Sequence, residues 1–234
     1  MNEPVTVFDD LVERAVAVAE RSADRSGAAL LGIVGVPGAG KTTLARAVVA
    51  AVAARLGRQA VQHVPMDGFH LADVELERLG RRNFKGAADT FDPAGYAALL
   101  ARIAAGGEQT SYAPMFERDI EQPIAGAIPV LPGTRLVVTE GLYLLADGPW
   151  AAVRAVLDEC WFVNRSEPDG TARLIARHEQ FGKTHEQAIS WVARVDAVNA
   201  EQVMGTRGRA DLVVAGDIDL PAHPTLPAPP AQPV

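Results

Sequence analysis

Short apolar runs alternate with helical patterns along most of the chain. The apolar runs, which are typical of buried strands, lie at 28–35, 60–66, 135–139, 159–163 and 210–216. Helical spacing of apolar residues or helix-start signals predict helices at 8–25, 43–57, 92–105, 149–157, 168–181 and 185–204. Because strands alternate with helices, the pattern favours an α/β fold, with a parallel sheet covered by helices on both faces.

Two segments between the second and third predicted strands break this alternation. Residues 68–91 form an irregular, basic stretch with one short predicted helix at 73–80, and 107–134 contain four prolines and short predicted strands. We therefore expect a single domain over residues 1–220 that carries an insertion at 68–134. The Pro/Ala-rich segment 221–234 is expected to be a disordered tail.

Composition and charge narrow the classes of function. The chain has 234 residues, of which 48% are hydrophobic, and a net charge of -7 with a pI of about 5.3. This acidity argues against a surface that binds nucleic acid or anionic lipid, although a local basic pocket for a small anion is still compatible with it. One cysteine, Cys160, excludes an intrachain disulfide. With an acidic start and no long apolar run, the chain is expected to be cytoplasmic, without a membrane or nucleic-acid partner, and a homodimer is left open.

The segment "GVPGAGKT" (35–42) fits the phosphate-loop pattern G-x-x-x-x-G-K-[ST] at every fixed position, with a strand before it and a helix after it. Glycines let the backbone N–H groups turn inward around an anion, and the helix N-terminus adds its dipole. Lys41 is expected to reach the β and γ phosphates, and the Thr42 hydroxyl to ligate Mg²⁺. The predicted nucleotide-binding set is Gly35, Gly38, Ala39, Gly40, Lys41, Thr42 and Thr43.

Two acidic residues follow the next predicted strands, at Asp67 and Glu140. In parallel sheets, ligands bind beyond the carboxyl ends of the strands, so both acids are expected at the same edge as the phosphate loop. Residue chemistry alone leaves two alternatives for each. Asp67 is either an Asp-Gly turn residue or a proton acceptor, and Glu140 is either a solvated strand-end acid or a metal ligand.

Other phosphate-loop proteins are disfavoured by missing motifs. No Asn-Lys pair is present for an N-K-x-D guanine site, and no L-S-G-G-Q-like segment of transporter ATPases occurs. The insertion, followed by a helical segment with spaced arginines, instead suits a kinase with an acceptor lobe and a closing lid.

The ordered set "MDGFHL", "FKGAADTFD", "APMFERDIEQPI", "VVTEGLYLL" and "RLIARHEQFGK" resembles the phosphoribulokinase, uridine kinase and pantothenate kinase family of P-loop kinases. The likeness spans roughly residues 28–216 and is strongest to bacterial members labelled nucleoside/nucleotide kinase-like or fructose-transport-system kinase. It implies a P-loop NTPase fold with a five-stranded parallel core and a lid at 166–184. It also implies the use of ATP and Mg²⁺ and transfer of the γ-phosphoryl group to a substrate hydroxyl.

Catalytic roles follow from the same resemblance. Asp67 would be the catalytic base for the acceptor hydroxyl, and Glu140 would serve Mg²⁺ together with Thr42. Arg173 and Arg177, four residues apart on a helix, would stabilise charge on the transferred phosphoryl group with Lys41. Solvated positions are the alternative for these arginines.

Binding roles are assigned more broadly. Asn199 and Arg209 are candidates for the nucleotide base end. The candidate acceptor-binding residues are His70, Arg81, Lys85, Tyr112, Phe116 and Arg118. For these, solvated loops or core packing are the competing explanations. The acceptor, a small hydroxylated molecule, is left open among pantothenate, a nucleoside and a sugar or sugar phosphate. The competing function is a nucleotide-binding regulatory ATPase that acts through a protein partner.

Overall fold

A five-stranded parallel sheet forms the centre of the molecule in the computed structural model, which describes residues 4–165 and 169–221. Its spatial order is β2-β5-β1-β6-β7, and every neighbouring pair is parallel. The strands are β1 (Ala29–Val34), β2 (Val61–His63), β5 (Leu136–Gly141), β6 (Glu159–Asn164) and β7 (Leu212–Ala215). The predicted fold class is therefore confirmed.

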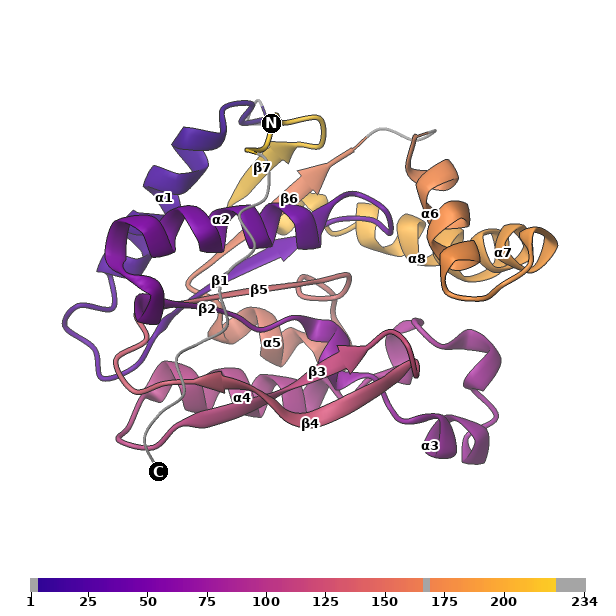
Figure 1. Cartoon of the computed structure of the whole chain (residues 1–234), viewed down its shortest axis with the longest axis horizontal. Coiled ribbons are helices and arrows are strands. Elements are labelled where there is room, and N and C mark those ends of the chain that lie inside the picture. The colour runs from indigo at the N-terminus through magenta and orange to yellow at the C-terminus, as the bar shows by residue number, and fades with distance from the viewer. Residues whose placement is uncertain (1–3, 166–168, 222–234) are drawn as a thin grey trace.

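Helices cover both faces of the sheet, which explains why the central strands are apolar without alternation. All six residues of β1 and all six of β5 are buried. Figure 1 shows two helices on one face, α1 (Phe8–Glu20) and α2 (Lys41–Leu56), and two on the other, α4 (Pro93–Ala105) and α5 (Ala151–Val156). The predicted start of α4 is confirmed, because the Asp92 side chain accepts a hydrogen bond from the Gly95 N–H at 2.8 Å.

The insertion between β2 and β5 is more regular than its prolines suggested. It contains α3 (Asp73–Arg78) and an antiparallel hairpin of β3 (Ser111–Glu117) and β4 (Gln122–Val130) that packs beside α4 (Figure 1). The pairing register shifts between Ala113 and Met115, at Pro114, which has no N–H to donate. Short 3₁₀ turns complete the chain's regular elements, at Met66–Phe69, Arg82–Phe84 and Ala88–Thr90 here and at Arg58–Ala60, Gly148–Trp150 and Arg207–Arg209 elsewhere.

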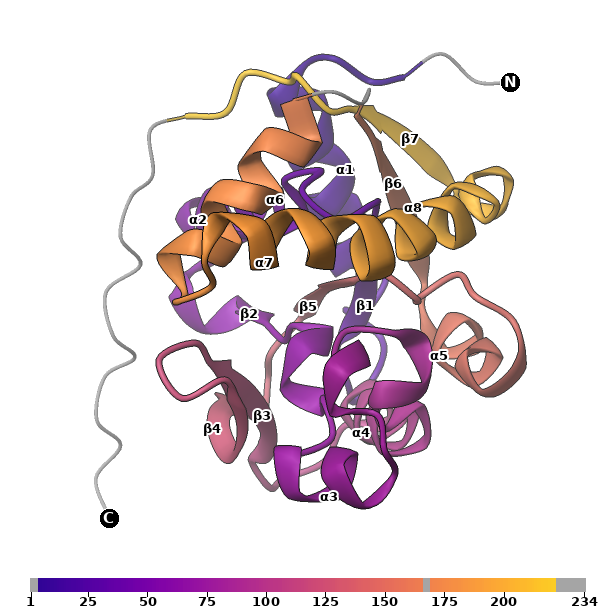
Figure 2. The ribbon, with the colours of Figure 1, turned by 90° about the vertical axis from the view of Figure 1, so that its right-hand side faces the viewer.

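The helices after β6 form a separate layer that crosses the carboxyl edge of the sheet (Figure 2). They are α6 (Asp169–Gln180), α7 (His185–Trp191) and α8 (Ala197–Met204). The predicted capping box at the start of α7 is present, formed by Thr184 and Gln187. The predicted helix over 185–204 is confirmed as one helical run, although it contains a π-helical turn, Val192–Asp196, between α7 and α8.

Two strand boundaries also differ from the predictions. The second strand ends at His63 and is followed by extended Pro65 and a 3₁₀ turn, so Asp67 lies beyond the strand. The third strand is longer than predicted and includes Glu140, because its pairing with β1 continues to Gly141 opposite Val34. Apart from residue 221, the predicted tail at 221–234 lies outside the described residues. No helix in the described ranges is long and apolar enough to cross a membrane.

Candidate active site

The phosphate loop joins β1 to α2, in the strand–loop–helix context that the motif requires. Gly38 and Gly40 have positive φ angles of 74° and 91°, in the left-handed region that favours glycine. At Gly35, a β-carbon would lie 2.9 Å from the carbonyl oxygen of Val163 on β6. The glycines are thus needed both for the turn and for the close contact of the loop with the sheet.

Lys41 stands at the start of α2 with its Nζ inside the loop. This Nζ donates a hydrogen bond to the carbonyl oxygen of Val36 at 3.0 Å. Burial lowers the pKa of Lys41 to about 8, while the nearby carboxylates of Glu140 and Asp67 favour its charged form. A buried ammonium next to a concave loop of N–H groups is a suitable partner for polyphosphate oxygens.

Glu140 is a buried acid at the end of β5, with 5% of its surface exposed. The Thr42 hydroxyl donates to Glu140 Oε1 at 2.9 Å, and the His63 Nε2 lies 3.9 Å from the same oxygen without a hydrogen-bond partner. Burial, reinforced by the charge of Asp67, raises the pKa of Glu140, and Lys41 and Thr42 oppose this shift. The charge of the Glu140 carboxylate is only partly compensated. Together with the Thr42 hydroxyl, this carboxylate forms a pair of oxygen donors suitable for a divalent cation.

The chemistry of this donor pair fits Mg²⁺ bound with a nucleotide. Within residues 4–165 and 169–221, no group of three or more His, Cys, Asp or Glu side chains is arranged to hold a metal ion. Mg²⁺ typically takes one or two protein oxygens and completes its shell with phosphates and water. Thr42 and Glu140 therefore match a site that a triphosphate would complete.

Asp67 lies in the 3₁₀ turn after β2 and faces the same space. Arg118 from β3–β4 contacts it, with Nη2 2.5 Å from Asp67 Oδ2. Burial acts to raise the pKa of Asp67, but the positive charges of protonated His70, Arg118 and Lys41 outweigh burial and hold the pKa below its ordinary value. The carboxylate is therefore ionised at neutral pH and able to accept a proton.

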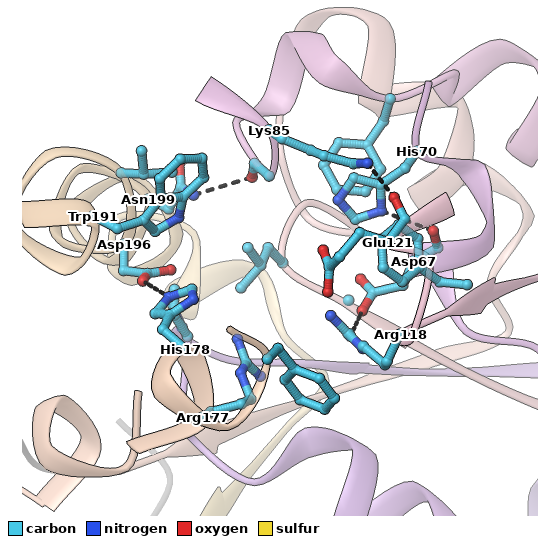
Figure 3. A pocket seen from close by; sticks show the side chains of 18 of the residues that line it. Asp67, His70, Lys85, Arg118, Glu121, Arg177, His178, Trp191, Asp196 and Asn199 are labelled. Atoms are coloured by element: carbon cyan, nitrogen blue, oxygen red, sulfur yellow. Dashed lines mark hydrogen bonds and ion pairs between the residues drawn. The ribbon is translucent and has the colours of Figure 1, made fainter. Parts of the chain in front are cut away.

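These groups open into one cavity of about 380 Å³. One wall comes from the sheet edge and the insertion, and contributes Asp67, His70, Lys85, Arg118 and Glu121 in Figure 3. The opposite wall comes from α6, α7, the π turn and α8, and contributes Arg177, His178, Trp191, Asp196 and Asn199. The phosphate loop reaches the cavity through Pro37, Gly38, Lys41 and Thr42.

The helical wall is held by contacts between its own helices and by a contact with the insertion. His178 on α6 pairs with Asp196 of the π turn, with Nε2 2.8 Å from Oδ2. Asn199 on α8 donates from Nδ2 to the carbonyl oxygen of Gly86 in the insertion at 3.1 Å. The Lys183 Nζ lies 4.5 Å from the centroid of the Trp191 ring. The π turn thus contacts α6, and α8 contacts the insertion.

The cavity brings together many of the residues selected from the sequence, but not all of them. Those that line it are Gly38, Lys41, Thr42, Asp67, His70, Lys85, Phe116, Arg118, Glu140, Arg177 and Asn199. Asn199 lies against the insertion, although it was predicted for the nucleotide base end.

Several selected residues lie elsewhere. Arg81 pairs with Asp89 at 2.8 Å, and Arg209 pairs with Asp147 at 2.6 Å. Tyr112 is 58% exposed, and Thr43 and Arg173 are exposed outside the cavity lining. Successive turns of α6 are about 5 Å apart, so only its Arg177 end reaches the cavity. Their binding roles stay predictions.

Sequence reasoning missed several residues that line the cavity, among them Glu121, His178, Trp191 and Asp196, as well as His63, which lies beside Glu140. Trp191 and Asp196 are placed by the π turn, for which the helical pattern gives no signal. Glu121 does carry a local signal, because it ends the charged turn Arg118–Glu121 between two strands. The direction of its side chain, however, depends on how the hairpin folds.

Comparisons with known proteins show which family the chain resembles. No protein-family model matches the chain. A Schizosaccharomyces pombe protein named "Putative uridine kinase" is 31% identical over 217 residues, covering 90% of this chain and 91% of that protein. A pantothenate kinase of Mycolicibacterium vanbaalenii is 27% identical and covers 86% of this chain and 70% of the relative.

A solved structure adds to this likeness. The crystal structure described as a "putative fructose transport system kinase" from a Silicibacter species is 34% identical, with a TM-score of 0.77, and covers 87% of this chain and 98% of the other. The resemblance noted in the sequence is confirmed. The chain belongs to the uridine kinase and pantothenate kinase family of P-loop kinases and is an ATP-dependent kinase.

Proposed function

We propose that this kinase transfers the γ-phosphoryl group of ATP to a hydroxyl group of a small metabolite, with Asp67 as the base. The observation that carries the proposal is the placement of an ionised Asp67 in the same cavity as Lys41 and the Thr42–Glu140 pair. The acceptor oxygen bonds to the γ-phosphorus as the bond from that phosphorus to the bridging oxygen breaks. ADP leaves, and the hydroxyl proton passes to Asp67.

Each side chain has a separate task in this step. The loop N–H groups and Lys41 bind the phosphates, and Arg177 on the opposite wall balances charge that develops during transfer. Thr42 and Glu140 would hold Mg²⁺, which supplies charge neutralisation for the β and γ phosphates when bound. Arg118 orients Asp67 and keeps it ionised.

The test is ATP turnover with Mg²⁺ across a panel of hydroxylated metabolites that includes pantothenate, nucleosides, free sugars and sugar phosphates. We expect one class to stimulate turnover strongly and to yield a phosphorylated product, detected by mass spectrometry. Uniformly slow turnover that changes only with a protein partner would instead support a regulatory ATPase and overturn the proposal.

A further inference from the structure

The wall formed by the sheet edge and the insertion is called the acceptor wall below. Its positive charges are already paired with carboxylates of the same wall. Lys85 Nζ lies 2.6 Å from Asp73 Oδ1, and Arg82 Nε lies 3.2 Å from Asp73 Oδ2. Arg118 is paired with Asp67. An anionic group on the acceptor would have to displace one of these internal partners, which makes the wall a poor site for a phosphate or a carboxylate.

Among the described acids of the insertion that line this wall, Glu121 is the one without a cation partner. It lies in the turn between β3 and β4 and lines the cavity on the side of Asp67 and Lys85 (Figure 3). Within the part of the chain that the structure describes, its carboxylate has no hydrogen bond or ion pair. Its backbone has a φ of 53°, the one positive value among the described residues other than glycine.

The strained turn is held by Lys85, whose Nζ donates to the carbonyl oxygen of Glu121. Lys85 thereby anchors the backbone of Glu121 while its charge is paired with Asp73. The carboxylate of Glu121 is therefore presented at a defined position in the cavity, and it is free to accept hydrogen bonds from a ligand.

His70 adds a second acceptor. Its Nδ1 lies 2.8 Å from the carbonyl oxygen of Asp67, which can only accept, so Nδ1 carries the proton. Burial lowers the pKa of His70, so the ring is neutral at pH 7 and its Nε2 has a free lone pair. Together with Asp67 and Glu121, His70 gives this side of the cavity oxygen and nitrogen acceptors, while the charges of Lys85, Arg82 and Arg118 are each paired with a carboxylate.

From this complementarity we infer that the phosphoryl acceptor is an uncharged molecule with several neighbouring hydroxyl groups, and that Glu121 determines specificity by accepting hydrogen bonds from hydroxyls beside the one that reacts. The inference rests on the proposed function. A free sugar and the ribose of a nucleoside share this chemistry. Pantothenate and sugar phosphates, which carry an anionic group, are disfavoured.

The structure suggests variants that separate the carboxylate from its backbone. Glu121→Gln keeps the shape and removes the charge. Glu121→Gly removes the side chain and also relieves the positive φ, so its melting temperature should be unchanged or higher. Asp119→Asn is the matched control, because Asp119 is an exposed acid of the same hairpin turn outside the cavity lining.

The acceptor panel is then divided into four arms: free sugars, nucleosides, phosphorylated sugars and carboxylate-bearing alcohols such as pantothenate. We expect an uncharged arm to give the highest kcat/KM, with the first two arms distinguishing a sugar from a nucleoside. Both Glu121 variants should raise the KM for the best acceptor by about tenfold or more, as expected for loss of a charged hydrogen bond, with the KM for ATP unchanged. Asp119→Asn should match the wild type.

Two outcomes would overturn the inference while the kinase assignment stands: a phosphorylated or carboxylated acceptor preferred over the uncharged arms, or an unchanged acceptor KM in the folded Glu121 variants. Failure of the proposed function is recognised differently, since no arm would then yield a phosphorylated product with the wild-type protein.

Discussion

The two ends of the central sheet differ in how fully their acidic side chains are hydrogen-bonded. At the amino ends of the strands, Asp158 accepts a hydrogen bond from the Leu30 N–H at 2.9 Å, and Asp211 accepts one from the Cys160 N–H at 2.7 Å. Glu159 is 3% exposed and is bonded to Arg14, Arg21 and the Trp161 indole N–H.

At the carboxyl ends, Asp67 is paired with Arg118, but Glu140 lacks such compensation. Glu140 is nearly as buried as Glu159, but within the described residues its carboxylate accepts a hydrogen bond from the Thr42 hydroxyl alone. Burial and the charge of Asp67 raise its pKa. A buried acid with all its hydrogen bonds made stabilises the packing of strands and helices. A buried acid that lacks such partners favours the binding of a positive charge. Hydrogen-bond satisfaction, rather than burial, therefore distinguishes Glu159 from Glu140, the acid that we propose serves Mg²⁺.

Asp67→Asn gives the largest expected effect. The variant loses the proton acceptor, so kcat should fall by about 10²- to 10⁴-fold, while ATP affinity and the melting temperature are kept. Single-turnover kinetics and calorimetric ATP binding measure the two quantities. Lys41→Ala is the companion variant, and it should weaken triphosphate binding as well as turnover. Near-normal turnover of Asp67→Asn would contradict the assignment of the base.

Glu140→Gln should act on the metal rather than on the fold. Because the substitution removes an oxygen ligand charge, the Mg²⁺ concentration for half-maximal nucleotide binding should rise by about 10- to 100-fold. The melting temperature should not fall, since a buried charge that repels Asp67 is lost. Titration of Mg²⁺ in a nucleotide-binding assay provides the readout, and an unchanged Mg²⁺ dependence would argue against Glu140 as a metal ligand.

Glu159→Gln should show the reverse pattern, with loss of stability and intact catalysis. Removing the charge weakens the bonds from Arg14 and Arg21, so the free energy of unfolding should fall by about 2 kcal/mol. Both arginines are more than 40% exposed, which lets water take over part of the lost interaction. Denaturant unfolding measures the loss. A drop in kcat of the folded variant would break the distinction between the two ends.

Asp92→Ala should have the smallest effect, because Asp92 belongs to neither end. It caps α4 through a single hydrogen bond to the Gly95 N–H, and loss of a helix cap costs about 1 kcal/mol. The kcat should be unchanged. Asp92→Ser is the control, since serine is also a favourable cap, and it should recover most of the stability. Equal losses in both variants would point to another role for the side chain.

Much of the framework could be predicted from the chain because its signals are local. The phosphate-loop pattern, the Asp92 cap and the Thr184–Gln187 capping box depend on residues within a few positions of one another. The five apolar strands could be predicted equally well, because burial on both faces of the sheet leaves few polar positions in them. Parallel pairing then places Lys41, Asp67 and Glu140 at one edge.

The distribution of charge partners could not be predicted, because each pair joins residues far apart in the sequence. From the sequence, the basic stretch around Lys85 favours a site for an anion. In the folded protein, however, Asp73 and the carbonyl oxygen of Glu121 contact the ammonium group of Lys85. Arg173 and Arg177 look equivalent as residues of one helix, yet only Arg177 lines the cavity.

By itself, then, the sequence determined the fold class, the phosphate loop and the presence of two acids at the carboxyl edge of the sheet, since hydrophobic period and short motifs act locally. Only the tertiary structure decided which cations are already neutralised, that a π turn brings Trp191 and Asp196 to the cavity, and that the Glu121 carboxylate has no partner among the described residues. The physical reason is that electrostatic compensation depends on distances in space, which sequence separation does not encode.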